Sequence, residues 1–134
     1  MIEVSWDNPE KNIMRFNYKG KWTWEELAAA LSNGRRLWET EGDGPVGTII
    51  DVTSSSMIPQ NAFTAGRNMV KDTEFQHVSA VVGANAFIQH FHNVFNRIYG
   101  GKLQNRRLFF VATLEEARRI IAERLAEIDE TAVN

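Results

Sequence analysis

The sequence predicts a single α/β domain over residues 1–134, in which a mixed, mostly parallel sheet alternates with amphipathic helices. Three observations support this fold class: short apolar or alternating segments typical of strands, longer stretches with one apolar face, and turn residues between them. The chain has 43% hydrophobic residues, 24% charged residues and no cysteine. This composition indicates one soluble core and excludes thiol catalysis, thiolate metal sites and a disulfide scaffold.

The first two strands are predicted from period-two alternation. Ile2, Val4 and Trp6 alternate with polar residues. Over 13–19, Met14, Phe16 and Tyr18 alternate with Ile13, Arg15 and Asn17, so each strand has one buried face. The turn-forming residues of 7–12 lie between the two segments and indicate a β-hairpin. The first strand is therefore expected to be an antiparallel edge strand.

The remaining elements follow in the order helix, strand, helix, strand, helix, strand, helix. Thr23 stands three residues before Glu26, which is the spacing of a capping box, and the helix that it begins should end at 41–45. Further strands are predicted over 46–52, 78–82 and 108–111, and further helices over 59–71 and 85–99. A last helix begins after Thr113 and frays into a polar tail at 129–134. The order ββαβαβαβα predicts parallel crossovers between neighbouring strands.

This order, together with the motif Asp51-Val52-Thr53 at the end of an apolar strand, resembles the STAS family, which includes anti-sigma-factor antagonists. The C-terminal FFVATLEEARRII is similar to the last strand and helix of SpoIIAA-like proteins, an uncharacterised subgroup and the better match. The resemblance covers nearly the whole chain. It implies a STAS-like, SpoIIAA-like fold and a protein–protein switch.

In that family the switch is a serine at the start of the second helix, which a partner kinase phosphorylates. The corresponding stretch of this chain is Ile58-Pro59-Gln60-Asn61-Ala62, which has no serine. We therefore expect a binding surface at the carboxyl ends of the strands that phosphate does not switch. Its residues are predicted to be Asp51, Thr53, Ser54, Ser55, Ser56 and Asn61.

The predicted helix at 85–99 carries an unusually wide aromatic and aliphatic arc. Part of it is expected to face a homodimer interface or an apolar ligand pocket, because aromatic residues are enriched on such surfaces. Trp22, Trp24 and Trp38 could contribute to the same surface. The predicted residues are Phe87, Phe91, Phe95 and Tyr99.

Other site chemistry finds little support in the residues. His90 and His92 are two residues apart on a helix, so their side chains diverge and no metal site or cofactor is expected. The net charge of −2 and the absence of a long apolar run argue against nucleic acid and membrane partners, and predict a cytoplasmic protein.

The function predicted from the sequence is non-enzymatic protein binding in a regulatory or scaffolding role. A small apolar-ligand or lipid carrier that uses the aromatic helix is one alternative. An enzyme of unrecognised class at the strand ends from Asp51 to Asn61 is another, although no histidine is predicted there to activate a nucleophile.

Overall fold

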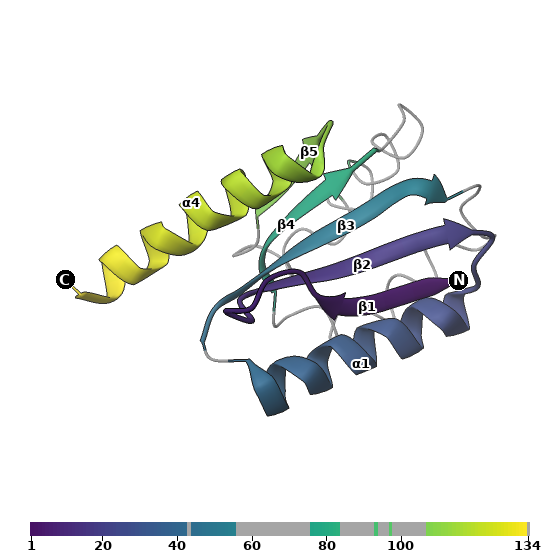
Figure 1. The fold of residues 1–134 in the computed structure, drawn as a ribbon, viewed down its shortest axis with the longest axis horizontal. Coiled ribbons are helices and arrows are strands. Elements are labelled where there is room, and N and C mark those ends of the chain that lie inside the picture. Colours follow the sequence, from purple (N-terminus) through teal and green to yellow (C-terminus); the bar gives the residue numbers. More distant parts are fainter. Residues whose placement is uncertain (43, 56–75, 84–92, 94–96, 98–106, 134) are drawn as a thin grey trace.

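The protein is described by a computed structural model at residues 1–42, 44–55, 76–83, 93, 97 and 107–133. Its strands, in chain order, are β1 (Ile2–Trp6), β2 (Ile13–Gly20), β3 (Val46–Ser55), β4 (Gln76–Val82) and β5 (Arg107–Val111). They form one sheet in the same spatial order, with β1 antiparallel to β2 and all other pairs parallel (Figure 1). The predicted mixed sheet with an antiparallel edge strand is confirmed. The helices predicted over 59–71 and 85–99 lie outside the described residues.

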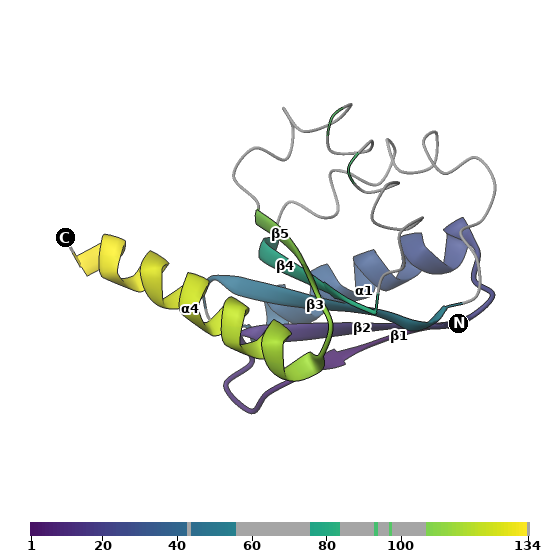
Figure 2. The same cartoon turned by 90° about the horizontal axis from the view of Figure 1, so that it is seen from above.

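Two described helices lie on opposite faces of this sheet (Figure 2). α1 (Trp24–Glu41) packs most closely on β1, whereas α4 (Leu114–Val133) packs on β3, β4 and β5. Successive residues of a strand point to opposite faces, so the even-numbered residues of β2 face α1 and the odd-numbered ones face the side of α4. The sheet is therefore covered by different helices at its two edges.

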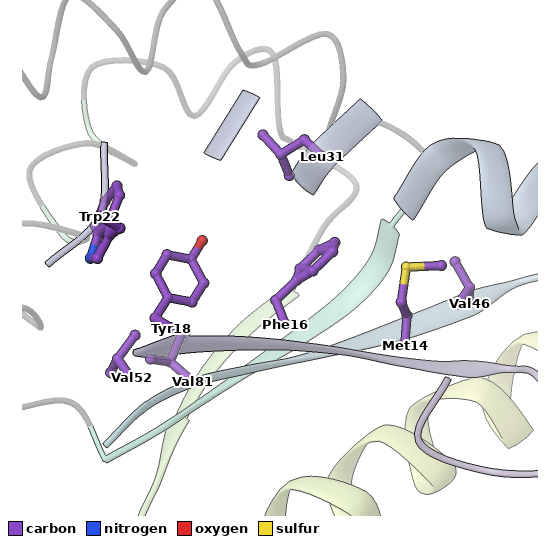
Figure 3. Close-up of a cluster of buried hydrophobic side chains, with 8 residues drawn as sticks. All are labelled: Met14, Phe16, Tyr18, Trp22, Leu31, Val46, Val52 and Val81. Atoms are coloured by element: carbon purple, nitrogen blue, oxygen red, sulfur yellow. The ribbon is translucent and has the colours of Figure 1, made fainter. Parts of the chain in front are cut away.

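The core on the α1 side is built on three consecutive even positions of β2. Met14, Phe16 and Tyr18 rise from this strand toward α1 and Leu31 (Figure 3). Gly34 permits this close packing, because a Cβ atom there would lie 2.8 Å from Cζ of Phe16. The buried cluster consists of Met14, Phe16, Tyr18, Trp22, Leu31, Val46, Val52 and Val81.

The core on the other face joins α4 to the middle of the sheet. Ala117 and Ile121 are fully buried, and they pack on Ile49 and Val78 of the central strands. Gly47 lies directly under Ile121, since an added Cβ atom would overlap Cγ2 of that side chain. The predicted apolar stripe of the last helix is thus confirmed at its buried centre.

Both predicted N-caps are present, but each is only half a capping box, because among the described residues neither Glu26 nor Glu116 accepts a hydrogen bond from the amide of its cap residue. Oγ1 of Thr23 accepts a hydrogen bond from the amide of Glu26 at 3.1 Å, and Oγ1 of Thr113 accepts one from the amide of Glu116 at 3.1 Å. The carboxylate of Glu26 does not return to the backbone of Thr23 as predicted. It lies instead 3.4 Å from the ammonium group of Met1, because a charged donor is a stronger partner than an amide.

Three predicted boundaries are wrong. β4 begins at Gln76, two residues before its predicted start. β3 continues three residues past Val52, because Lys19 and Gly20 of β2 pair with Ser54 and Ser55 beyond a register shift. The last helix does not fray at 129 but runs to Val133. Each further residue of an existing helix adds one backbone hydrogen bond, so the helix can continue beyond its apolar stripe.

Candidate functional site

The strand ends predicted to form the binding surface are only partly described. Asp51 lies within β3, four residues before its end, and its neighbour on β2 is Asn17. Thr53, Ser54 and Ser55 belong to the same strand, whereas Ser56 and Asn61 lie outside the described residues. The prediction that these six residues form one binding surface is therefore not tested.

Asp51 is held by two neighbours. Its Oδ2 lies 3.3 Å from Nη2 of Arg15, and its Oδ1 accepts a hydrogen bond from the amide of Thr53 at 3.0 Å. Nε of Arg15 also donates to Oδ1 of Asn17 at 2.8 Å. The Asp51 side chain is 17% exposed and that of Arg15 is 27% exposed, so the pair lies at the surface of the sheet. This arrangement orients the carboxylate and leaves its charge balanced.

A second carboxylate extends the same network. Asp7, which follows β1, is almost fully buried with 3% of its side chain exposed, and Arg118 of α4 donates to it from Nε at 2.8 Å and from Nη2 at 3.0 Å. The hydrogen bond to Asp7 raises the pKa of Arg118 above its ordinary value. Nη1 of Arg15 lies 4.0 Å from the same carboxylate.

The sequence analysis did not identify Asp7, Arg15 and Arg118 as a group. In the sequence, only the alternate positions of Arg15 and Asn17 on β2 pointed to this group, since they place a charged and an amide side chain on one sheet face. Together the two arginines and two aspartates form a neutral ionic network. Such a network fixes strands and helix relative to one another more readily than it performs acid–base chemistry.

Trp22, which follows β2, connects the carboxyl ends of β2 and β3. Nε1 of Trp22 donates to Oγ of Ser55 at 3.0 Å, and the ring of Trp22 meets those of Tyr18 and Trp24 edge-on at centroid distances of 5.2 and 5.0 Å. Burial raises the pKa of the Tyr18 hydroxyl well above its usual range. The hydroxyl of Ser55 thus has a structural partner inside the fold.

The aromatic surface predicted on the third helix is not described. Phe87, Phe91, Phe95 and Tyr99 lie outside the described residues, so the interface or pocket that they were expected to form stays a prediction. Trp22 is part of the core, and Nε1 of Trp38 donates to the carbonyl oxygen of Gly44 at 2.9 Å beyond the end of α1.

No group of three metal-ligating side chains occurs within the part of the chain that the structure describes. His77 is an exposed residue of β4, and the other two histidines fall outside this part. Among the described helices, none is both long and apolar enough to cross a bilayer.

Among the described helices, α4 packs on only part of the sheet face that it contacts. α4 packs on β3, β4 and β5. On the same face, Ile13 at the start of β2 is buried in the core beneath α4, whereas the other residues of β1 and β2 are polar and exposed or half-buried. Nζ of Lys19 lies 3.1 Å from Oε2 of Glu3 on this face. We call this surface the polar half-face, and it consists of Glu3, Ser5, Arg15, Asn17 and Lys19.

No family model matches the sequence, and no curated protein matches it either. A mixed five-stranded sheet with an antiparallel edge places the chain among small α/β domains. A solved structure specifies the fold further: an uncharacterised protein of the DUF3478 family with a SpoIIAA-like fold, from Shewanella loihica PV-4. It is 15% identical to this chain, the match covers 90% of this chain and 92% of the other, and the TM-score is 0.61. The fold is therefore SpoIIAA-like, as the sequence analysis predicted.

Proposed function

We propose that this chain is a non-enzymatic protein-interaction domain with a regulatory or scaffolding role, and that it binds its partner through the polar half-face. The observation that supports this proposal is that α4 packs on only some of the strands of the sheet face that it contacts. α4 packs on β3, β4 and β5, while β1 and β2 present ordered polar side chains on the same face. A fixed polar surface of this kind suits a partner protein that offers complementary hydrogen-bonding and charged groups.

The neighbouring carboxylates also support binding rather than catalysis. Asp51 is engaged by Arg15 and the amide of Thr53, and Asp7 is engaged by Arg118. A carboxylate that acts as a general base or a nucleophile needs an oxygen available to the substrate, whereas these two are engaged by donors of the fold. The carrier alternative depends on the aromatic residues of the predicted third helix, which the structure does not describe, so we advance no second function.

The test compares partner capture by two matched charge reversals. Glu3→Lys disrupts the exposed pair with Lys19 on the polar half-face, and Glu39→Lys disrupts an exposed pair with Arg35 on α1. The two glutamates are matched, because their side chains are 48% and 53% exposed and each lies 3.1 Å from its partner. Tagged full-length chains are cross-linked in the native host, and the captured proteins are quantified by mass spectrometry.

We expect a discrete protein partner that the wild type and Glu39→Lys enrich equally. Glu3→Lys should lower its enrichment by about tenfold, the effect of losing a few charged contacts at an interface. Absence of any partner above the background of an untagged control would refute the proposed function. Equal enrichment by both variants would show that the partner binds elsewhere.

A further inference from the structure

The outer edge of β1 carries backbone groups that no described strand pairs. The amide of Lys19 donates to the carbonyl oxygen of Met1 at 2.7 Å, and the amide of Asp7 donates to that of Ile13 at 2.8 Å. In an antiparallel pair, alternate residues direct both backbone groups to the partner strand. Glu3 and Ser5, which share the parity of Met1 and Asp7, therefore bond β2. The N–H and C=O groups of Ile2, Val4 and Trp6 point away from the sheet.

β1 is a short edge strand with one exposed charged residue, Glu3, but it lacks the stronger blocks to strand addition. Its sequence IEVSW contains no proline and no lysine, and its pairing with β2 has no register shift. Natural proteins commonly use such residues, or a bulge, to prevent another strand from adding to an edge. The edge of β1 is thus suited by its backbone to accept one more strand.

The two sides of this edge differ chemically. On the α1 side, the side chains of Ile2, Val4 and Trp6 are only half-buried, although they pack against the α1-side core. Nε1 of Trp6 is buried and has no hydrogen-bond partner within the described residues. On the opposite side lie Glu3 and Ser5 of the polar half-face. A strand added here would bury apolar side chains on one face and expose polar ones on the other.

The position of α1 favours a different protein, rather than a second copy of this chain, as the occupant of this edge. It runs alongside β1 and packs most closely on that strand (Figure 1). If the β1 strands of two copies paired in one continuous sheet, the twofold axis would place both α1 helices on the same face above the junction. The two helices would then compete for one strip of the sheet. A single extended segment from another protein brings no second helix and can lie beside β1 next to α1.

We propose that the edge of β1 is a strand-addition site for an extended segment of a partner protein. The segment alternates apolar residues, which pack toward α1, with polar residues, of which a basic one would lie near Glu3. This proposal rests on the proposed protein-interaction function and specifies how the partner binds. The outward N–H and C=O groups of Ile2, Val4 and Trp6 form the main-chain hydrogen bonds, and the side chains select the alternating pattern.

The test uses the synthetic peptide acetyl-Lys-Val-Thr-Val-Lys-Val-Thr-amide as the probe and the full chain as the receptor. Binding is followed by heteronuclear NMR and amide exchange at millimolar peptide. We expect the amides of Ile2, Val4 and Trp6 to exchange rapidly in the free chain and about tenfold more slowly with the peptide. A matched peptide that is N-methylated at its valines should leave exchange unchanged, because it lacks the donors of one strand edge.

Two variants at Val4 distinguish the contribution of the backbone N–H group to peptide binding from that of the side chain. Val4→Pro removes the outward N–H group, and Val4→Ala removes a similar amount of packing but keeps that group. Val4→Pro should weaken peptide binding about tenfold relative to Val4→Ala. Ile2→Pro, at the first residue of β1, is the second test if Val4→Pro does not fold.

The possible outcomes also distinguish this proposal from the proposed function. Failure of the wild type to bind the peptide, or equal binding by the alanine and proline variants, overturns the strand-addition site. Slow exchange of the three outward amides that depends on protein concentration also overturns it, because the occupant is then a second copy. If Val4→Pro still captures the cellular partner and Glu3→Lys does not, strand addition is wrong and the polar half-face remains the binding surface.

Discussion

Replacing Gly47 by alanine should lower the free energy of unfolding, because this glycine lies directly beneath Ile121 of α4. An added Cβ atom would overlap Cγ2 of Ile121 and lie 3.1 Å from Cγ1 of Val78. Both neighbours are fully buried and cannot turn outward. Overpacking of this kind costs about 1–3 kcal/mol, and alanine recovers about 0.5–1 kcal/mol of strand entropy relative to glycine. The expected net loss is about 1–2 kcal/mol.

A second substitution tests the physical cause. Ile121→Ala removes the overlapping methyl group and alone should cost about 2–5 kcal/mol through the cavity that it leaves. In the double variant, the alanine at 47 projects into that cavity. The combined loss should therefore be at least about 1 kcal/mol smaller than the sum of the two single losses.

Urea unfolding followed by tryptophan fluorescence and far-UV circular dichroism measures these differences. Gly20→Ala is the control, because Gly20 has a φ of +57° and no atom near its hypothetical Cβ atom. Alanine there should cost about 1 kcal/mol from its backbone conformation alone, and this cost should add to that of Ile121→Ala. If Gly47→Ala were as stable as wild type, or if its loss added fully to that of Ile121→Ala, the close approach of α4 would be refuted.

Three further predictions concern hydroxyl groups that are buried or half-buried. Thr48→Val should raise the free energy of unfolding by about 1 kcal/mol, because the Thr48 hydroxyl is buried without a hydrogen-bond partner among the described residues; a lower urea midpoint would contradict this. Ser55→Ala should cost about 0.5–1.5 kcal/mol and change the emission of Trp22, its donor, and an unchanged spectrum with unchanged stability would count against that contact. Burial raises the pKa of Tyr18 above its ordinary value of 10.0, so its contribution to stability is complete below that pH and is lost as the pH rises further. Alkaline unfolding of Tyr18→Phe should then show a weaker pH dependence, and parallel curves for variant and wild type would disprove the assignment.

The sequence predicted the faces of the sheet well, because side-chain alternation is a local property. The alternation on β2 assigned Met14, Phe16 and Tyr18 to one face and Arg15 to the other, and the structure has this arrangement. The end of β3 was missed for a physical reason. An apolar run that stops at Val52 marks the limit of burial, but the backbone ladder continues wherever a neighbouring strand supplies partners.

The ionic network could not be predicted in the same way. Arg15 and Asp51 are 36 residues apart, and Arg118 and Asp7 are 111 residues apart. Their proximity depends on the register of β2 against β3 and on the placement of α4, neither of which local periodicity determines. The direction of the free backbone groups on β1 has the same origin, since the pairing of Met1 with Lys19 decides which residues face outward.

The network also explains why α4 does not extend over β1 and β2. Arg118 lies one helical turn into α4 and donates two hydrogen bonds to Asp7, which directly follows β1. These bonds hold the start of α4 against the hairpin turn. Ile121 packs on the central strands over Gly47, which holds the middle of the helix there. With these two attachments, α4 cannot slide toward β1 without exposing Ile121 and leaving the buried carboxylate of Asp7 without its bidentate partner. Both losses are costly, because one exposes apolar surface and the other leaves a buried charge poorly paired. The same contacts that stabilise the fold therefore keep α4 away from the polar half-face and the adjacent edge of β1.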